Sequence, residues 1–247
     1  MLTAVLLVPL VVLMLYGGIA AVIAGAVIGL IMSWEISSML FAGRRFLQTG
    51  YCLLLVAPFV VMEFGVAAAY PMLAVITALL LLGLVHGSWI AALVSSALGV
   101  ALVSLGQVLA DPQRLTYLLV LVIAITATDS AAYFGGRYFG GPKMAVKISP
   151  SKTWSGAVCG LAGAMLAVTI LALLLDAPLL SMLGYGIVLS IASMIGDLLE
   201  SALKRHHDVK DSGNLLGHHG GLLDRFDGYL IALPVLAALL LIDFSHG

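Results

Sequence analysis

The sequence predicts an all-α, polytopic integral membrane protein with about nine transmembrane helices. Of its 247 residues, 62% are hydrophobic and 9% are charged, whereas soluble domains average roughly 45–50% and 25%. Apolar runs of about 15 to 20 residues recur along the chain, long enough to cross a hydrocarbon core about 30 Å thick. The runs lack the alternating pattern of membrane barrel strands, and helices satisfy their own backbone hydrogen bonds in lipid. A helical bundle is therefore the expected fold.

Nine spans are predicted in chain order. They cover residues 2–16, 17–34, 50–64, 66–85, 88–109, 116–136, 155–175, 178–200 and 229–244. The first two are ambiguous, since one long tilted helix broken at Gly17 and Gly18 also accounts for residues 2–34. No Lys or Arg precedes the apolar run at Leu2, so it lacks the positive region of a cleaved signal peptide and is expected to be retained.

The distribution of basic residues predicts the orientation in the membrane. With nine spans and a cytoplasmic N-terminus, only Arg114 of the 11 basic residues falls outside the cell, as the positive-inside rule requires. Loops 137–154 and 201–228 carry eight of the ten inside residues. Any chemistry is therefore expected at the cytoplasmic face, within a C-terminal region 111–247 that follows N-terminal helices 1–110. A bacterial inner membrane suits this arrangement.

Composition disfavours several classes of protein. Cys52 and Cys159 lie far apart inside apolar segments, which suggests neither a disulfide framework nor a cysteine metal site. A net charge of −1 and the absence of a polybasic run argue against a nucleic-acid partner. No internal repeat is evident, so a transporter built from inverted repeats gains no support.

The segment "MIGDLLESALKR" places a polar stripe at the end of the eighth span. Asp197, Ser201 and Lys204 are spaced i, i+4 and i+7, so they share one helix face, with Glu200 beside them. A lone lysine at a helix end commonly extends toward the membrane interface. A carboxylate near membrane depth costs roughly 2.5–3.5 kcal/mol, however. We therefore expect Asp197 to have a partner or a catalytic task.

The segment "HHGGLLDRFDG" brings two more carboxylates to the entrance of the last span. Asp224 and Asp227 are three residues apart, so on a helix they face the same way and, with Asp197, converge on a hard cation. Carboxylate oxygens suit Mg²⁺ better than Zn²⁺. The alternative is a pair of first-turn acids stabilised by the helix dipole. Gly220 and Gly221 let the backbone approach a ligand, and at most one of the four neighbouring histidines is expected to contact substrate.

A third polar segment, "TDSAAYFGGRYFGGPKMAVKISPSKTWSG", precedes the seventh span. Ser151 or Thr153 is expected to cap the following helix. Membrane topology alone explains the basic residues Arg137 and Lys152, but it does not explain Asp129 inside an apolar run. "GGRYFGG" lacks the ending of a P-loop. Carboxylates for a divalent metal and Lys and Arg for phosphate oxygens together predict a polyphosphate that reacts beside a lipid.

The last polar loop, residues 201–228, carries a family resemblance. "SALKRHHDVKDSGNLLGHHGGLLDRFD" resembles the signature of the phosphatidate cytidylyltransferases, or CDP-diacylglycerol synthases, and "DSAAYFGGRYFG" and "SPSKTWSG" resemble that family too. Gly217 and His218 stand where the family more often has Pro and Gly. Eleven positions of the signature are matched over 27 residues: Ser201, Lys204, Arg205, Lys210, Asp211, His219, Gly220, Gly221, Asp224, Arg225 and Asp227.

The resemblance implies a nucleotidyltransferase of phospholipid biosynthesis that converts CTP and phosphatidic acid into CDP-diacylglycerol and pyrophosphate. It implies Mg²⁺ at Asp197, Asp224 and Asp227, a second cation such as K⁺, and Ser201 and Lys204 beside them. The family includes dimers, so a homodimer is compatible. Substrate binding is expected to involve Asp129, Arg137, Lys152, Arg205, Lys210, Asp211, His219, Gly220, Gly221 and Arg225.

Three alternatives make different predictions. A CDP-alcohol phosphotransferase would need Arg and Asp at set places after Gly228, where an apolar helix follows instead. A CTP-dependent lipid kinase would transfer the γ-phosphoryl group and release CDP. An ion or anion transporter would line a pathway with intramembrane acids, whereas the charges here concentrate in loops expected on one side.

Overall fold

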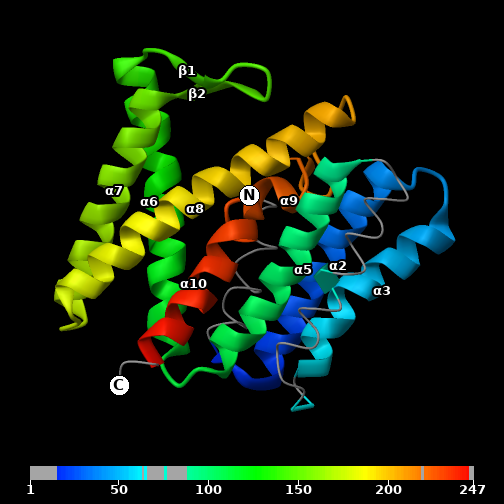
Figure 1. The fold of residues 1–247 in the computed structure, drawn as a ribbon, viewed down its shortest axis with the longest axis horizontal. Coiled ribbons are helices and arrows are strands. Elements are labelled where there is room, and N and C mark those ends of the chain that lie inside the picture. Colours follow the sequence, from blue (N-terminus) through cyan, green and yellow to red (C-terminus); the bar gives the residue numbers. More distant parts are fainter. Residues whose placement is uncertain (1–15, 63, 66–74, 77–87, 218–219, 245–247) are drawn as a thin grey trace.

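The computed structural model of the chain is predominantly helical (Figure 1). It describes residues 16–62, 64–65, 75–76, 88–217 and 220–244. The elements are α2 (Gly18–Leu40), α3 (Arg45–Met62), α5 (Trp89–Ala110), α6 (Arg114–Phe139), β1 (Lys143–Ala145), β2 (Ser149–Thr153), α7 (Trp154–Leu174), α8 (Leu179–His206), α9 (Leu223–Phe226) and α10 (Tyr229–Phe244).

The lengths and composition of these helices support a membrane protein. Within the described residues, six helices are long and apolar enough to cross a membrane: α2, α3, α5, α6, α7 and α8. The apolar part of α10, Tyr229–Ile242, is shorter. Seven of the nine predicted spans therefore coincide with helices. The predicted span 2–16 lies outside the described residues, as does 66–85 apart from residues 75–76.

The helix ends differ from the predicted spans at two places. α2 begins at Gly18, directly after Gly17 with φ +84°, so a helix boundary lies at the predicted glycine pair. α8 continues to His206, six residues beyond the predicted span 178–200, and this confirms the prediction that Ser201 and Lys204 lie on the same helix as Asp197. Ala, Leu, Lys and Arg in that stretch favour helix, and basic residues in a last turn interact well with the helix dipole.

A small antiparallel hairpin departs from the all-α prediction. β1 and β2 pair Lys143 with Thr153 and Ala145 with Ser149, within a segment that the sequence predicted as a loop. Gly140 and Gly141 precede the hairpin with φ of +61° and +101°, a conformation that glycine adopts readily. Thr153 ends β2 and caps α7, since its Oγ1 accepts from the N–H of Gly156 at 3.1 Å. This confirms one of the two expected caps.

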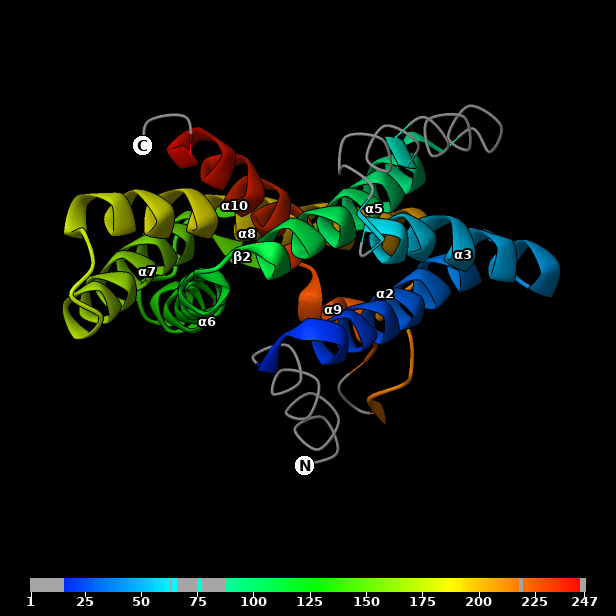
Figure 2. The ribbon, with the colours of Figure 1, turned by 90° about the horizontal axis from the view of Figure 1, so that it is seen from below.

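The helices form two groups joined by α8 and α10. α6 and α7 make an antiparallel pair that packs against α8, whereas α2, α3 and α5 pack together on the other side. α10 contacts both α5 and α8 (Figures 1 and 2). The α6–α7 pair depends on glycine, because a Cβ on Gly156 would lie 2.9 Å from the carbonyl oxygen of Ala132. Small residues allow this close approach of helices in membranes.

The packing also has the character of a membrane protein. Leu55 and Phe59 of α3 are fully buried and belong to one apolar cluster that extends through α2, α5, α6 and α8. Large apolar side chains remain exposed on the outer surface, including Leu180 at 85%; such surface is suited to lipid. Hydroxyl groups link helices in the interior: Thr128 Oγ1 lies 2.8 Å from Ser190 Oγ, joining α6 to α8.

Candidate active site

The predicted polar segments meet at one end of the bundle. The hairpin, the C-terminal end of α8 and α9 all lie toward the top of Figure 1. Arg205 Nε of α8 donates to the carbonyl oxygen of Ile148 between the two strands at 3.3 Å. Lys152 of β2 forms an ion pair with Asp197 of α8. Residues from loops 137–154 and 201–228 therefore contribute to one polar region.

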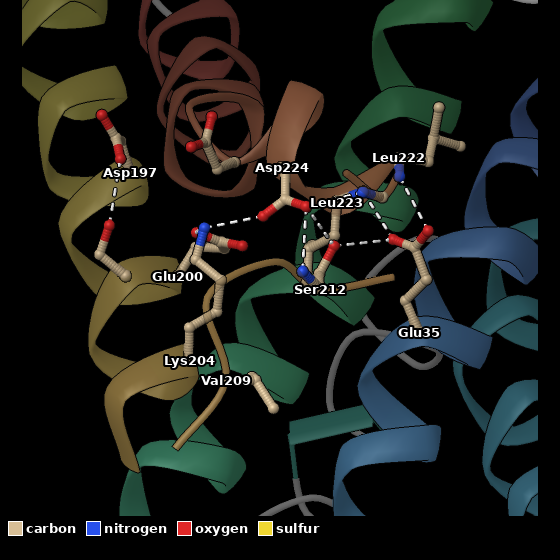
Figure 3. Close-up of polar contacts among 12 residues, drawn as sticks. Glu35, Asp197, Glu200, Lys204, Val209, Ser212, Leu222, Leu223 and Asp224 are labelled. Carbon is tan, nitrogen blue, oxygen red and sulfur yellow. Dashed lines mark hydrogen bonds and ion pairs between the residues drawn. The ribbon is translucent and has the colours of Figure 1, made fainter. Parts of the chain in front are cut away.

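Lys204 is the centre of one cluster in this region (Figure 3). Its Nζ lies 2.6 Å from Glu200 Oε2 and 2.7 Å from Asp224 Oδ1. The side chain of Glu200 is fully buried, and those of Asp224 and Lys204 are 9% and 14% exposed. An ammonium group between two buried carboxylates offsets part of the cost of removing them from water. Lys204 thus joins α8 to the turn that carries Asp224.

The second oxygen of Asp224 is held by neutral donors. Oδ2 accepts from the backbone N–H of Gly221 at 2.7 Å and from the N–H and Oγ of Ser212 at 2.9 and 3.0 Å. Burial opposes ionisation, but Lys204 and these donors outweigh it and lower the pKa of Asp224. Gly220 has φ +78°, and a Cβ there would lie 2.6 Å from Oδ2. Glycine is required because the backbone passes directly over the carboxylate.

Glu35 completes this cluster, and the sequence analysis missed it. It lies on α2 and is 5% exposed. Oε1 accepts from the N–H of Leu222, and Oε2 accepts from the N–H of Leu223, both at 2.8 Å. Ser212 Oγ lies 3.1 Å from Oε2. An acid inside the apolar run "GLIMSWEISSML" was the available signal, because such a group normally has a partner or a task.

Asp197 belongs to a second cluster. Its carboxylate is paired with Lys152, and Ser201 Oγ approaches its Oδ1 at 3.4 Å. Asp227 lies close enough for its pKa to rise to about 8, because burial and the negative charges of Asp197 and Asp129 all disfavour its ionised form. The three acids come from α6, α8 and the end of α9. This cluster is short of positive charge.

The acidic cluster has the donor chemistry of a hard-cation site. Among the described residues, no three His, Cys, Asp or Glu side chains are close enough together to form a complete metal site. Asp129, Asp197 and Asp227 nevertheless offer carboxylate oxygens, which Mg²⁺ prefers, and a divalent cation would relieve the repulsion that raises the pKa of Asp227. The donor chemistry of these residues therefore suits such an ion. Asp224, by contrast, already has partners on both oxygens.

The remaining predicted residues lie around these clusters. Arg137 is exposed at the end of α6, where its Nη1 donates to Tyr133 Oη at 3.1 Å. Lys210, Asp211 and Arg225 are exposed. His219 lies outside the residues that the structure describes. Gly221 packs beneath Glu35 and Ser212, since a Cβ on it would lie within 2.6 Å of both carboxylate oxygens of Glu35.

A cavity of about 730 Å³ opens beside the first cluster. Residues of α2 and α3 line it, together with Gly213, Asn214 and Leu215. Glu35 borders the cavity on one side and contacts the Asp224 turn on the other. The cavity is mostly apolar, so it suits an apolar group better than a phosphate.

Comparison with known proteins supplies the family. A family model described as the cytidylyltransferase family matches residues 1–243. The chain belongs to the cytidylyltransferase family. The resemblance that the motifs between Asp129 and Gly228 indicated is thereby confirmed, and the match extends beyond them to residues 1–243.

Individual relatives agree with this assignment. The protein named phosphatidate cytidylyltransferase from Bacillus subtilis (strain 168) is 46% identical over 132 residues, which are 53% of this chain and 49% of that protein. The one from Brucella suis biovar 1 (strain 1330) is 47% identical over 131 residues, 51% of this chain and 47% of that protein. The one from Staphylococcus saprophyticus is 40% identical over 131 residues, covering 52% and 50%. The chain spans about half the length of the curated relatives it matches.

Proposed function

We propose that this cytidylyltransferase-family protein is a phosphatidate cytidylyltransferase. It would transfer CMP from CTP to phosphatidic acid and release pyrophosphate. The observation that carries the proposal is the identity of 40–47% to relatives with that name, within a family match across residues 1–243. A bundle of apolar helices with charged clusters at one end is suited to a reaction between a lipid and a water-soluble nucleotide.

The proposed reaction requires neutralisation of the substrates' negative charges more than it requires a general base. A lipid phosphate oxygen attacks the α-phosphorus of CTP, and the bond to pyrophosphate breaks. The second pKa of a phosphate monoester is about 6, so the attacking group is largely ionised at neutral pH. The barrier then arises mainly from bringing two polyanions together, which positioned cations reduce.

The residues divide this work between the two clusters. Lys152 reaches the acidic cluster from the hairpin, and its ammonium, which pairs with Asp197, would meet the triphosphate or the lipid phosphate there. Lys204 holds Asp224 in place. The exposed cations would attract the substrates from solution: Arg137, Arg205, Lys210 and Arg225.

We also propose Mg²⁺ as the cofactor of this site, with K⁺ as a second cation. Asp197 and Asp227 would hold the Mg²⁺ ion, with Asp129 adjacent. Asp224 would join them only by giving up its present contacts with Lys204 and Gly221. When bound, the metal supplies positive charge for the phosphate oxygens. The same proposal includes about nine spans, an active site at the cytoplasmic face of a bacterial inner membrane, and a homodimer.

The test follows two labels from CTP. Purified protein in detergent receives phosphatidic acid and CTP labelled separately in the cytidine and in the γ-phosphate, with and without Mg²⁺. The proposed reaction moves the cytidine label into the lipid and releases the γ-label as pyrophosphate, only with metal. Entry of the γ-label into the lipid would show a kinase instead. If neither label moved, the proposed activity would be rejected.

A further inference from the structure

We infer that Glu35 is a positioning residue, which holds Ser212 and the turn from Gly221 to Asp224 against α2 in its working geometry. The contacts of Glu35 are seen in the structure whatever the activity of the protein. The expected effect on kcat rests on the proposed cytidylyl transfer. The inference joins a helix from the N-terminal part of the chain to a turn 177 to 188 residues later.

The hydrogen bonds of Glu35 fix two consecutive peptide groups. Oε1 receives the N–H of Leu222 and Oε2 receives the N–H of Leu223, both at 2.8 Å. A carboxylate that accepts two neighbouring N–H groups at such distances determines both the position and the orientation of that backbone. Bonds to an ionised acceptor are also stronger than neutral ones. The turn that begins α9, and with it Asp224, is thereby located relative to α2.

The backbone around Glu35 is shaped to receive a carboxylate. A Cβ on Gly221 would lie 2.6 Å from each carboxylate oxygen, and one on Gly213 would lie 2.8 Å from Oε1. Any side chain at Gly221 would therefore displace Glu35. The side chain of Glu35 is 5% exposed. Two glycines leave room for its carboxylate, and three protein donors lie within hydrogen-bond distance of it.

Ser212 connects Glu35 to the charged cluster beyond it. Its Oγ lies 3.1 Å from Glu35 Oε2 and 3.0 Å from Asp224 Oδ2, but a hydroxyl has one proton to donate. The two carboxylates therefore share one donor. Asp224 continues the chain to Lys204 and Glu200 on α8. A shift at Glu35 is expected to reach Asp224 through this hydroxyl and through the displaced turn (Figure 3).

The decisive variant is Glu35→Gln, which keeps the shape of the side chain. Gln has one acceptor oxygen, so its NH₂ group faces the N–H of Leu222 or Leu223. We expect amide hydrogen exchange in the peptide 212–226 to quicken by at least about ten-fold, the effect of losing one charge-assisted bond. Exchange in α6 and α7 should not change. The kcat should fall by at least about ten-fold with KM for CTP within about three-fold, the split expected when positioning and not binding is lost.

Two further variants make the experiment decisive. Ser33→Ala is the matched control, because Ser33 is buried on the same helix but donates to Gly29 of α2 itself; exchange and kcat should match wild type. Ser212→Ala removes the shared hydroxyl and keeps the hydrogen bonds from Leu222 and Leu223 to Glu35. It should therefore quicken exchange in the peptide 212–226 and lower kcat, each by less than Glu35→Gln does. It also provides the test if Glu35→Gln does not fold.

The outcomes separate the inference from the proposed function. Unchanged exchange at 212–226 in Glu35→Gln, or a kcat within about two-fold of wild type, overturns the positioning role. If Glu35→Gln does not fold, unchanged exchange in Ser212→Ala overturns it. If the wild-type protein transfers no cytidylyl group, the proposed function fails, and the exchange data alone then decide whether Glu35 holds the turn.

Discussion

Replacing Lys204 by Met tests the cluster that joins α8 to the Asp224 turn. The substitution keeps the apolar part of the side chain and removes the ammonium, which lies 2.6 Å from Glu200 Oε2 and 2.7 Å from Asp224 Oδ1. Removing one partner of a buried ion pair costs about 3–5 kcal/mol. Because Lys204 is 14% exposed, water can reach part of the cluster. We therefore expect the lower value, a loss of about 3 kcal/mol of unfolding free energy.

A second substitution identifies the origin of that loss. Glu200 has no exposed surface, so without Lys204 its carboxyl group is buried with no cation beside it. Glu200→Gln in the Lys204→Met protein removes this acid and should recover at least about 1 kcal/mol, measured as a coupling energy in a double-mutant cycle. The assay is denaturant unfolding in detergent, followed by circular dichroism and tryptophan fluorescence. Lys143→Met, at an exposed cation of β1, is the control and should change stability by about 0.5 kcal/mol or less.

The reasoning is refuted by either of two results. A loss below about 1 kcal/mol in Lys204→Met would mean that the three groups interact no more strongly than a surface pair. Additive effects of the two substitutions would mean that Glu200 does not depend on Lys204. In both cases Lys204 would be free to serve the substrate directly.

Three other predictions concern the acids and the hairpin lysine. Lys152→Ala should lower the rate of cytidylyl transfer by at least about ten-fold. It should lower the unfolding free energy by no more than about 1 kcal/mol, because the side chains of Lys152 and Asp197 are 24% and 32% exposed. A wild-type rate of transfer would show that Lys152 does not bind a substrate phosphate. Asp224→Asn should leave the protein in the membrane fraction with transfer below about a tenth of wild type, because an amide NH₂ would face Lys204; higher transfer contradicts this. For Asp227, burial and neighbouring charge raise the pKa from 3.8 to about 8, so its folded state binds the proton more tightly. In EDTA, the stability it contributes should be present below about pH 4 and lost as pH rises through about 8, and Asp227→Asn should flatten that profile in unfolding measurements. An unchanged profile would show that Asp227 does not titrate in this range.

Hydropathy predicted the helices well because every segment that crosses lipid must be apolar along its length. Seven predicted ranges coincide with helices, and the bounds of the last one, 229–244, match α10. The hairpin was missed because β1 and β2 have three and five residues, too few for a recognisable alternation. The extension of α8 past residue 200 agrees with the spacing of Asp197, Ser201 and Lys204, which predicted a shared helix face, and Lys204 and Arg205 are good helix formers.

The candidate site shows a sharper limit of sequence reasoning. Spacing alone predicted that Asp224 and Asp227 face the same way, yet α9 is a single turn, and its end separates them: Asp224 contacts Lys204 and Ser212, whereas Asp227 responds to Asp197 and Asp129. The membrane-depth signal that singled out Asp129 and Asp197 applied equally to Glu35. Its partners were not predictable, because a hydrogen bond across 187 residues leaves no local pattern.

The two clusters differ in how their acids are stabilised, and this difference favours separate roles. Glu35 and Asp224 accept from four backbone N–H groups and share the hydroxyl of Ser212, and Asp224 also pairs with Lys204, so both have partners within the protein. Asp227 accepts from the N–H of Gly228 at 2.7 Å, yet its pKa still rises to about 8. A carboxylate that its own protein leaves poorly stabilised gains most from a cation. Divalent-metal dependence should therefore follow substitutions at Asp197 and Asp227 more closely than those at Glu35, whose loss should alter the geometry of the turn and leave the metal affinity of the acidic cluster nearly unchanged.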